Sequence, residues 1–85
     1  MKTKYIVFEV DGYELMVLFP EIIEHKVMAA KLLNAQTSLG PLEKAISAGH
    51  VLDGKCHGES ISLHLKSREE DDKIYSSTGL MSIGS

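Results

Sequence analysis

The sequence of 85 residues predicts a two-layer α+β domain. One helix covers one face of a four-stranded antiparallel sheet made of two hairpins, in the order β-β-α-β-β. Asp11-Gly12 and Asp53-Gly54 each separate two runs of β-type residues, which is typical of a hairpin with a type I′ turn. Between the hairpins, apolar residues recur at helical spacing from Pro20 to about residue 35. These three observations carry the fold prediction.

The first hairpin pairs residues 4 to 10 with 13 to 19, so that Val10 lies opposite Tyr13 and Tyr5 opposite Leu18. Alternation gives it two apolar faces. One holds Ile6, Phe8, Val10, Leu15, Val17 and Phe19, and the other holds Tyr5, Val7, Met16 and Leu18, with Glu9 and Glu14 at the turn. Like charges directly opposite are unfavourable, so the glutamates should meet water or a cation.

A single helix can cover only one of these faces. We therefore expect an exposed interaction surface made of Tyr5, Val7, Met16 and Leu18, because monomers seldom leave such a patch bare. The expected function is a small non-enzymatic protein-interaction module, with a second copy (a homodimer) or another protein as its partner. An alternative is that residues 74 to 83 fold back over this face.

The helix is predicted over residues 20 to 35, with Pro20 in its first turn and Asn34 as a C-terminal cap. Gly40-Pro41 prevents further extension. The expected buried face contains Ile22, Ile23, Val27, Ala29, Ala30 and Leu33, and the opposite face contains Glu24, Met28 and Lys31.

The second hairpin is predicted over residues 44 to 52 and 55 to 65. Its core face is Ile46, Ala48, Ile61, Leu63 and Leu65, and its wet face is Ser47, Ser60, Ser62 and His64. Gly49 and Gly58 are expected bulge sites, and a bulge would change the register near the turn.

The chain divides into an α+β domain at residues 1 to 66 and a short acidic helix with a flexible tail at residues 67 to 85. Ser67 and Glu70 have the spacing of a capping box, which favours a helix start there. The acidic run from Glu69 to Asp72 is typical of a solvated face, and a basic partner could also dock on it.

Composition excludes several classes of protein. A net charge of −3 and scattered Lys and Arg residues argue against binding to nucleic acid. The single cysteine cannot form an internal disulfide and fits a reducing, cytoplasmic location. The sequence shows neither a signal peptide nor an apolar run long enough to span a membrane.

His50, His57 and Glu59 form the one polar cluster that this pairing creates. They could hold a metal ion in a small metal-binding protein or hydrolase, or the two imidazoles could stack beside Glu59. Cys56 and His57 are strand neighbours that point to opposite faces, so they cannot act together as nucleophile and base. We expect no catalytic residue, no metal and no cofactor.

Ala48-Gly49-His50-Val51 and the run from Cys56 to Asp71, Cys-His-Gly-Glu-Ser-Ile-Ser-Leu-His-Leu-Lys-Ser-Arg-Glu-Glu-Asp, resemble small uncharacterised proteins encoded by tailed phages and prophages. The resemblance implies a cytosolic accessory protein that modulates a host protein, and it supplies no catalytic residues. In those proteins the positions matching His50 and His57 are often aromatic, which favours a packed ring pair over metal ligands.

Overall fold

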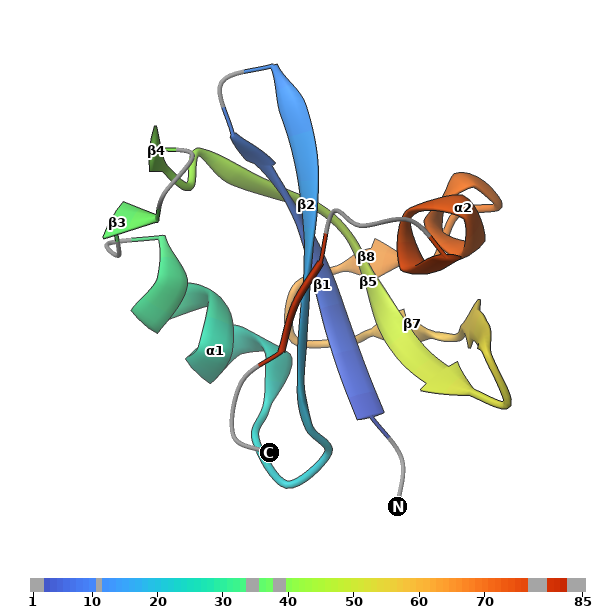
Figure 1. The fold of residues 1–85 in the computed structure, drawn as a ribbon. Helices are drawn as coiled ribbons and strands as arrows, with labels where there is room; N and C mark the ends of the chain where they lie inside the picture. Colours follow the sequence, from blue (N-terminus) through green and yellow to red (C-terminus); the bar gives the residue numbers. More distant parts are fainter. Residues whose placement is uncertain (1–2, 11, 34–35, 38–39, 77–79, 83–85) are drawn as a thin grey trace.

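The computed structural model describes residues 3–10, 12–33, 36–37, 40–76 and 80–82. A four-stranded antiparallel sheet with a fifth, parallel strand at its edge organises this part of the chain (Figure 1). The strands, in spatial order, are β6 (Lys55–His57), β5 (Lys44–Leu52), β1 (Thr3–Val10), β2 (Tyr13–Pro20) and β9 (Leu80–Ser82). The α+β class and the two hairpins are confirmed, and a second helix and the parallel strand are added.

The first hairpin matches the prediction in its register. Val10 pairs with Tyr13 and Tyr5 with Leu18, and β1 also pairs with β5, which places β1 at the centre of the sheet. The turn glycine, Gly12, has φ +83°, the left-handed conformation that an Asp-Gly turn requires.

The helix is shorter than predicted and presents a different face to the core. α1 spans His25–Leu32, because Pro20 ends β2 and the backbone is still extended at Glu24. Its buried residues are His25, Met28, Ala29 and Leu32, and the predicted buried face is wrong at Ile22, Val27, Ala30 and Leu33, which are exposed. Two apolar patterns overlap in this segment, and packing selected the one that includes Met28. The predicted cap, Asn34, lies outside the described residues.

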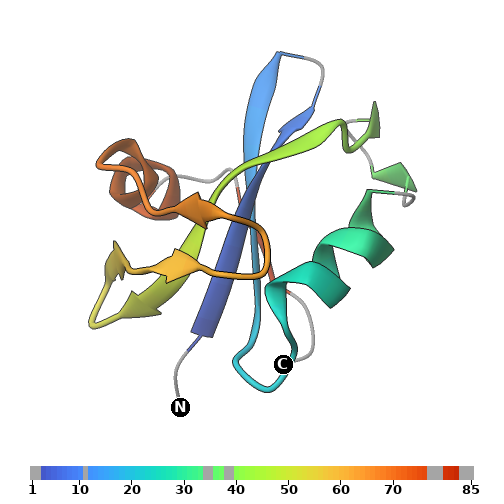
Figure 2. The same cartoon turned by 180° about the vertical axis from the view of Figure 1, so that it is seen from behind.

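The second hairpin follows the prediction only beside its turn. His50 pairs with His57 and Val51 with Cys56. β6 then ends, because Gly58 takes φ +81° and redirects the chain. The chain continues as a separate small hairpin of β7 (Glu59–Ser60) and β8 (Leu65–Lys66), which crosses in front of the sheet in Figure 2.

Because β6 ends before Gly58 and the register of β5 is irregular, several side chains lie on the opposite face of the strand from the one predicted. The register of β5 against β1 shifts between Val7 and Phe8, so Ile46 and Ser47 both face away from Ala48. Ser47 and Ser60, predicted to be wet, are buried, and Ile61, predicted to lie in the core, is exposed. Leu63 and Leu65 do pack against the core as expected.

Two hydrophobic layers lie on opposite faces of the sheet, with α1 over one and α2 (Glu70–Ser76) over the other (Figures 1 and 2). The main core contains Ile6, Phe8, Val10, Leu15, Val17, Phe19, Met28, Ala29, Leu32, Leu42 and Ala48. The second core contains Tyr5, Val7, Met16 and Val51, with Leu18, Ile46, Cys56, Ile74 and Tyr75 packed against it. The two short strands β3 (Gln36–Thr37) and β4 (Gly40–Pro41) pair with each other apart from this sheet.

Candidate functional site

The predicted interaction surface is not a free surface. Tyr5, Val7 and Met16 are fully buried and Leu18 is half-buried, so the expectation that they are exposed is wrong. α2 packs on the second core, and β9 pairs with the segment of β2 from Met16 to Leu18. The alternative in which residues 74 to 83 fold back over this face is confirmed at Ile74 and Tyr75, whereas residues 80–82 extend the sheet at its edge.

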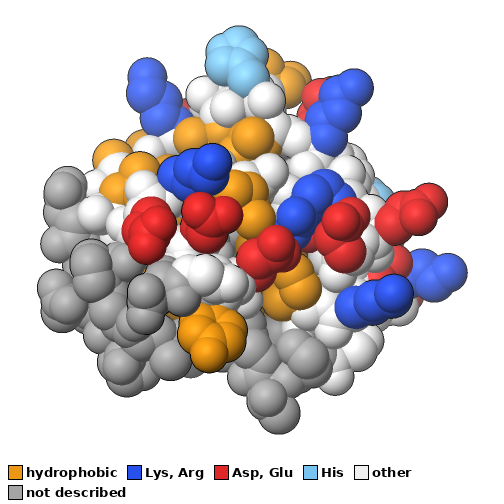
Figure 3. Space-filling model, turned by 90° about the horizontal axis from the view of Figure 1, so that it is seen from above, with side chains coloured by type: hydrophobic (Ala, Val, Ile, Leu, Met, Phe, Trp, Pro, Cys, Tyr) orange, Lys and Arg blue, Asp and Glu red, His pale blue; other side chains and the backbone are white. Residues whose placement is uncertain are grey.

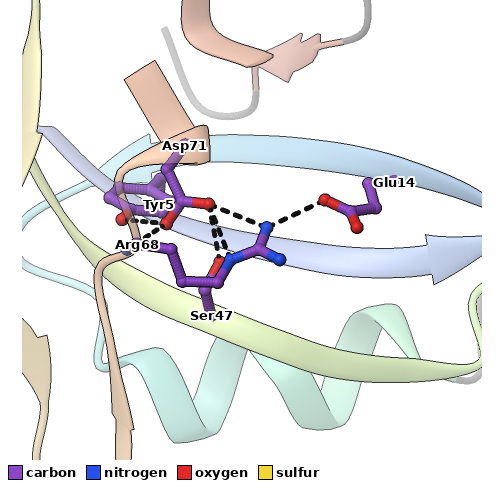
Figure 4. Close-up of polar contacts among 5 residues, drawn as sticks. All are labelled: Tyr5, Glu14, Ser47, Arg68 and Asp71. Atoms are coloured by element: carbon purple, nitrogen blue, oxygen red, sulfur yellow. Dashed lines mark hydrogen bonds and ion pairs between the residues drawn. The ribbon is translucent and has the colours of Figure 1, made fainter. Parts of the chain in front are cut away.

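A buried carboxylate anchors this C-terminal segment (Figure 4). Asp71 is fully buried, and its side chain accepts hydrogen bonds from the Tyr5 hydroxyl (2.6 Å) and the Ser47 hydroxyl (3.1 Å). It also accepts bonds from the Arg68 backbone N–H (2.9 Å) and Arg68 Nε (3.0 Å). A charged group is tolerated inside a protein only with such full pairing. Asp71 thus ties the start of α2 to strands β1 and β5.

Arg68 joins this anchor to the charged end of the first hairpin. Its Nη2 atom lies 2.8 Å from Asp71 Oδ1 and 2.9 Å from Glu14 Oε1. Glu9 lies in register with both Glu14 and Lys44, so each glutamate of the unfavourable pair has a cation beside it. Seen from this end, acidic side chains stand in a row among Lys and Arg side chains (Figure 3). The expectation that the glutamates meet a cation is confirmed at Glu14.

The protonation of the anchor follows from its burial. Burial and the adjacent Asp71 carboxylate raise the pKa of Tyr5 far above its ordinary value, so the phenol remains a hydrogen-bond donor. Burial alone would lower the pKa of Arg68, but its bonds to Glu14 and Asp71 outweigh that effect and raise it. Tyr5 therefore stays protonated and Arg68 stays charged across the physiological range, which suits their role in holding the C-terminal segment.

The rings of His25, His50 and His57 lie next to one another and form what we call the histidine column. His50 and His57 lie side by side, with ring centroids 6.1 Å apart and tilted by 33°. His25 stands edge-on to His50 at 5.6 Å, and Phe19 stands edge-on to His25 at 5.4 Å. In the part of the chain that the structure describes, no three His, Cys, Asp or Glu side chains are grouped to hold a metal ion. This part of the chain therefore gives no geometric support to the metal-site alternative for His50, His57 and Glu59.

His25 is the member of this column that the sequence analysis missed. It is buried in α1, and its Nε2 atom lies 2.9 Å from the Gly49 carbonyl oxygen, to which it donates when that nitrogen carries the proton. Burial lowers the pKa of His25, and nearby Lys4 and His50 lower it further, against the opposing effect of the Gly49 bond. The signal that could have found it is the spacing of His25, Met28, Ala29 and Leu32, which is that of one helix face.

A shallow cleft of about 240 Å³ lies beside His25 and His50. Its walls carry charges of both signs, and it is lined by Lys4, Glu24, His25, His50, Glu59, Ser60, Ile61 and Ser62. The Lys4 ammonium already donates to the Ile23 carbonyl (3.0 Å), and no buried side-chain nitrogen or oxygen of the described residues lacks a partner. The cleft therefore offers no buried polar group that calls for a ligand.

Cys56 is no better placed for nucleophilic chemistry. Burial, followed by the charges of Asp72 and Asp71, raises the pKa of the thiol to about 12. Asp72 is held close by the Cys56 backbone N–H, which donates to Asp72 Oδ1 at 2.7 Å. A thiol of this pKa carries almost no thiolate at neutral pH, so Cys56 acts as a small packed side chain.

The apolar surface that does face solvent lies on α1. The outer strip, as we call it, consists of Ile22, Val27, Ala30 and Leu33; Ile22 is 85% exposed, Val27 47% and Leu33 38%. Ile61, 80% exposed, lies in the turn between β7 and β8, and that turn meets the start of α1 where the Lys26 N–H donates to Ser62 Oγ (3.2 Å). Ile22 lies in the turn before α1 and Leu33 is its C-cap residue, so within the helix the solvent side combines Val27 and Ala30 with Lys26 and Lys31.

Comparisons of the chain with family models, with curated proteins and with solved structures found no match. Among the described residues, no helix combines the length and the apolar character needed to cross a membrane. The assignment of function therefore depends on the surface itself.

Proposed function

We propose that the protein is a small, non-enzymatic, cytoplasmic protein-interaction module that docks through the outer strip of α1. The observation that carries the proposal is that three large apolar side chains in and beside α1, Ile22, Val27 and Leu33, are exposed. Exposed apolar side chains that gather on one surface mark sites of protein interaction, so we expect the outer strip to be covered by another protein.

The chemistry of the interior supports the same role. The buried polar groups that the sequence and structure bring together are occupied in holding the fold: Asp71 anchors α2, and His25 bonds to the Gly49 carbonyl. The resemblance of residues 48 to 71 to accessory proteins of tailed phages agrees with a binding role, because it implies modulation of a host protein and supplies no catalytic residue.

Site-directed photo-cross-linking tests the proposal. A benzophenone amino acid replaces Val27 in the full chain expressed in bacterial cells, and the matched control carries it at Leu52, which is also 47% exposed but is the last residue of β5. We expect a defined adduct, with a second copy or another protein, at position 27 and not at position 52. The same pattern of adducts at both positions, or none at position 27, would overturn the proposal.

A further inference from the structure

We propose that the outer strip of α1 docks against the outer strip of a second copy, with the two helices antiparallel. This inference rests on the proposed function and specifies its partner. It follows from how charged and apolar residues are spaced along α1.

The charges of α1 are self-complementary in this orientation. Glu24, the N-cap residue, and Lys31, in the last turn, are both exposed, and they lie seven residues apart. Seven residues are close to two turns, so both occupy the same side of the helix, roughly 10 Å apart along its axis. In an antiparallel pair, Glu24 of each copy lies opposite Lys31 of the other, whereas in a parallel pair this side of one helix faces the other side of its partner and the two charges do not meet. Antiparallel helix dipoles add to the preference.

The apolar residues of the outer strip are centred near the midpoint between Glu24 and Lys31. The midpoint between Glu24 and Lys31 falls between Val27 and Met28, and Ile22 and Leu33 are equally distant from that point in the sequence. Antiparallel pairing about this point brings the Val27 side chains together, and Ile22, in the turn before α1, and Leu33, the C-cap residue, flank them. A two-fold interface requires this kind of patch, in which one surface complements itself.

The flanking groups permit close approach. Ala30 is small, which lets the second helix pack near the backbone, and Lys26 borders the strip with a flexible stem that can carry its charge into solvent. α1 is only eight residues long, so the contact is smaller than a standard interface. We therefore expect a weak dimer, with a dissociation constant on the order of 10⁻⁴ M.

The other exposed charged helix is a less suitable occupant. α2 carries exposed Glu69 and Glu70 near its start, but it covers the opposite face of the sheet from α1. Contact between α1 of one copy and α2 of the next would leave an α1 and an α2 unpaired at the ends. Such a head-to-tail contact does not close unless the copies form a ring. Pairing α1 with α1 closes at two copies.

Reciprocal charge reversal tests the pairing by sedimentation of the purified full chain over a range of concentrations. Glu24→Lys gives a helix with Lys at both positions, and Lys31→Glu gives one with Glu at both. Each variant alone should dimerise roughly tenfold more weakly, because two attractive pairs become repulsive. An equimolar mixture of the two should recover association near the level of the unaltered chain, as should the double variant Glu24→Lys/Lys31→Glu. Recovery in the mixture also shows that both variants are folded.

Matched controls change the charge elsewhere on the surface. Lys55→Glu and Glu69→Lys alter the net charge by the same amounts at exposed positions outside α1, and they should leave dimerisation unchanged. A monomer at millimolar concentration, or charge variants that are no weaker than these controls, would overturn the antiparallel dimer. An adduct of position 27 with a different protein, together with a monomeric purified chain, would retain the proposed function and reject the second copy as partner.

Discussion

Replacing Asp71 by alanine should remove a large part of the stability of the fold. The carboxylate is fully buried and accepts bonds from Tyr5, Ser47 and Arg68, so its loss leaves two hydroxyls and a guanidinium without their acceptor. Breaking a buried ion pair by removing one partner costs about 3–5 kcal/mol. A chain of this length has a free energy of unfolding of roughly 4–13 kcal/mol. Asp71→Ala should therefore remove about a quarter or more of the free energy of unfolding at 25 °C.

Urea unfolding followed by circular dichroism measures this loss. Asp71→Asn keeps the shape and part of the hydrogen bonding, so we expect a smaller cost of about 2 kcal/mol. Tyr5→Phe removes a single donor and should cost about 1–2 kcal/mol. The matched control is Glu70→Ala, one residue away in the same helix but exposed, which should change the free energy of unfolding by less than about 0.5 kcal/mol.

A double-mutant cycle separates the Tyr5–Asp71 bond from general effects of each substitution. Because the two side chains are in direct contact at 2.6 Å, the cycle of Tyr5→Phe with Asp71→Asn should give a coupling energy above about 0.5 kcal/mol. If Asp71→Ala costs no more than Glu70→Ala, or if the cycle shows no coupling, the carboxylate does not anchor the C-terminal segment and the reasoning is refuted.

Three further predictions concern the histidine column and its surroundings. Gly49→Ala should cost about 1–3 kcal/mol in urea unfolding, because the added Cβ would lie 2.5 Å from the backbone oxygen of His57; an unchanged unfolding midpoint would contradict this. The free energy of unfolding should fall as the pH drops below about 6.5, because burial lowers the pKa of His25 and the unfolded chain then binds a proton that the folded chain does not. His25 contributes at most about 1.4 kcal/mol per pH unit to the dependence of this free energy on pH. That contribution should vanish in His25→Gln but persist in His64→Asn. At pH 8, iodoacetamide should alkylate Cys56 on the order of a thousandfold more slowly in the native chain than in urea, because the native thiol has a pKa of about 12 against an ordinary value near 9, and equal rates would contradict this.

The first hairpin was predictable because its signals are local. Asp11-Gly12 determines the turn, and a two-residue loop sets the register of every later pair, as the pairing of Tyr5 with Leu18 shows. The same reasoning succeeded beside Asp53-Gly54 and failed four residues later, at Gly58. Gly58 was recognised as irregular, but sequence alone does not tell a bulge from a positive φ that ends the strand.

The helix face and the candidate site were not predictable for a different reason. Two apolar patterns compete between Ile22 and Leu33, and their periodicity is equally helical, so only contacts with the sheet decide which one is buried. Asp71 looked like any member of a solvated acidic run. Its burial depends on Tyr5 and Ser47, which lie 66 and 24 residues away, and no local pattern reports such distant partners.

The sequence contains more apolar surface than one helix and one sheet can cover. The structure exposes a different part of that surface from the part predicted. The sheet face with Tyr5 and Met16 is covered by α2, so the uncovered apolar surface is the outer strip of α1. The location of the exposed apolar surface determines which substitutions can separate an effect on binding from an effect on folding. Changing Tyr5 or Met16 to serine would damage a core and unfold the chain whatever the protein binds. Changing Val27 to serine removes an exposed side chain, so a loss of association there would report on binding alone.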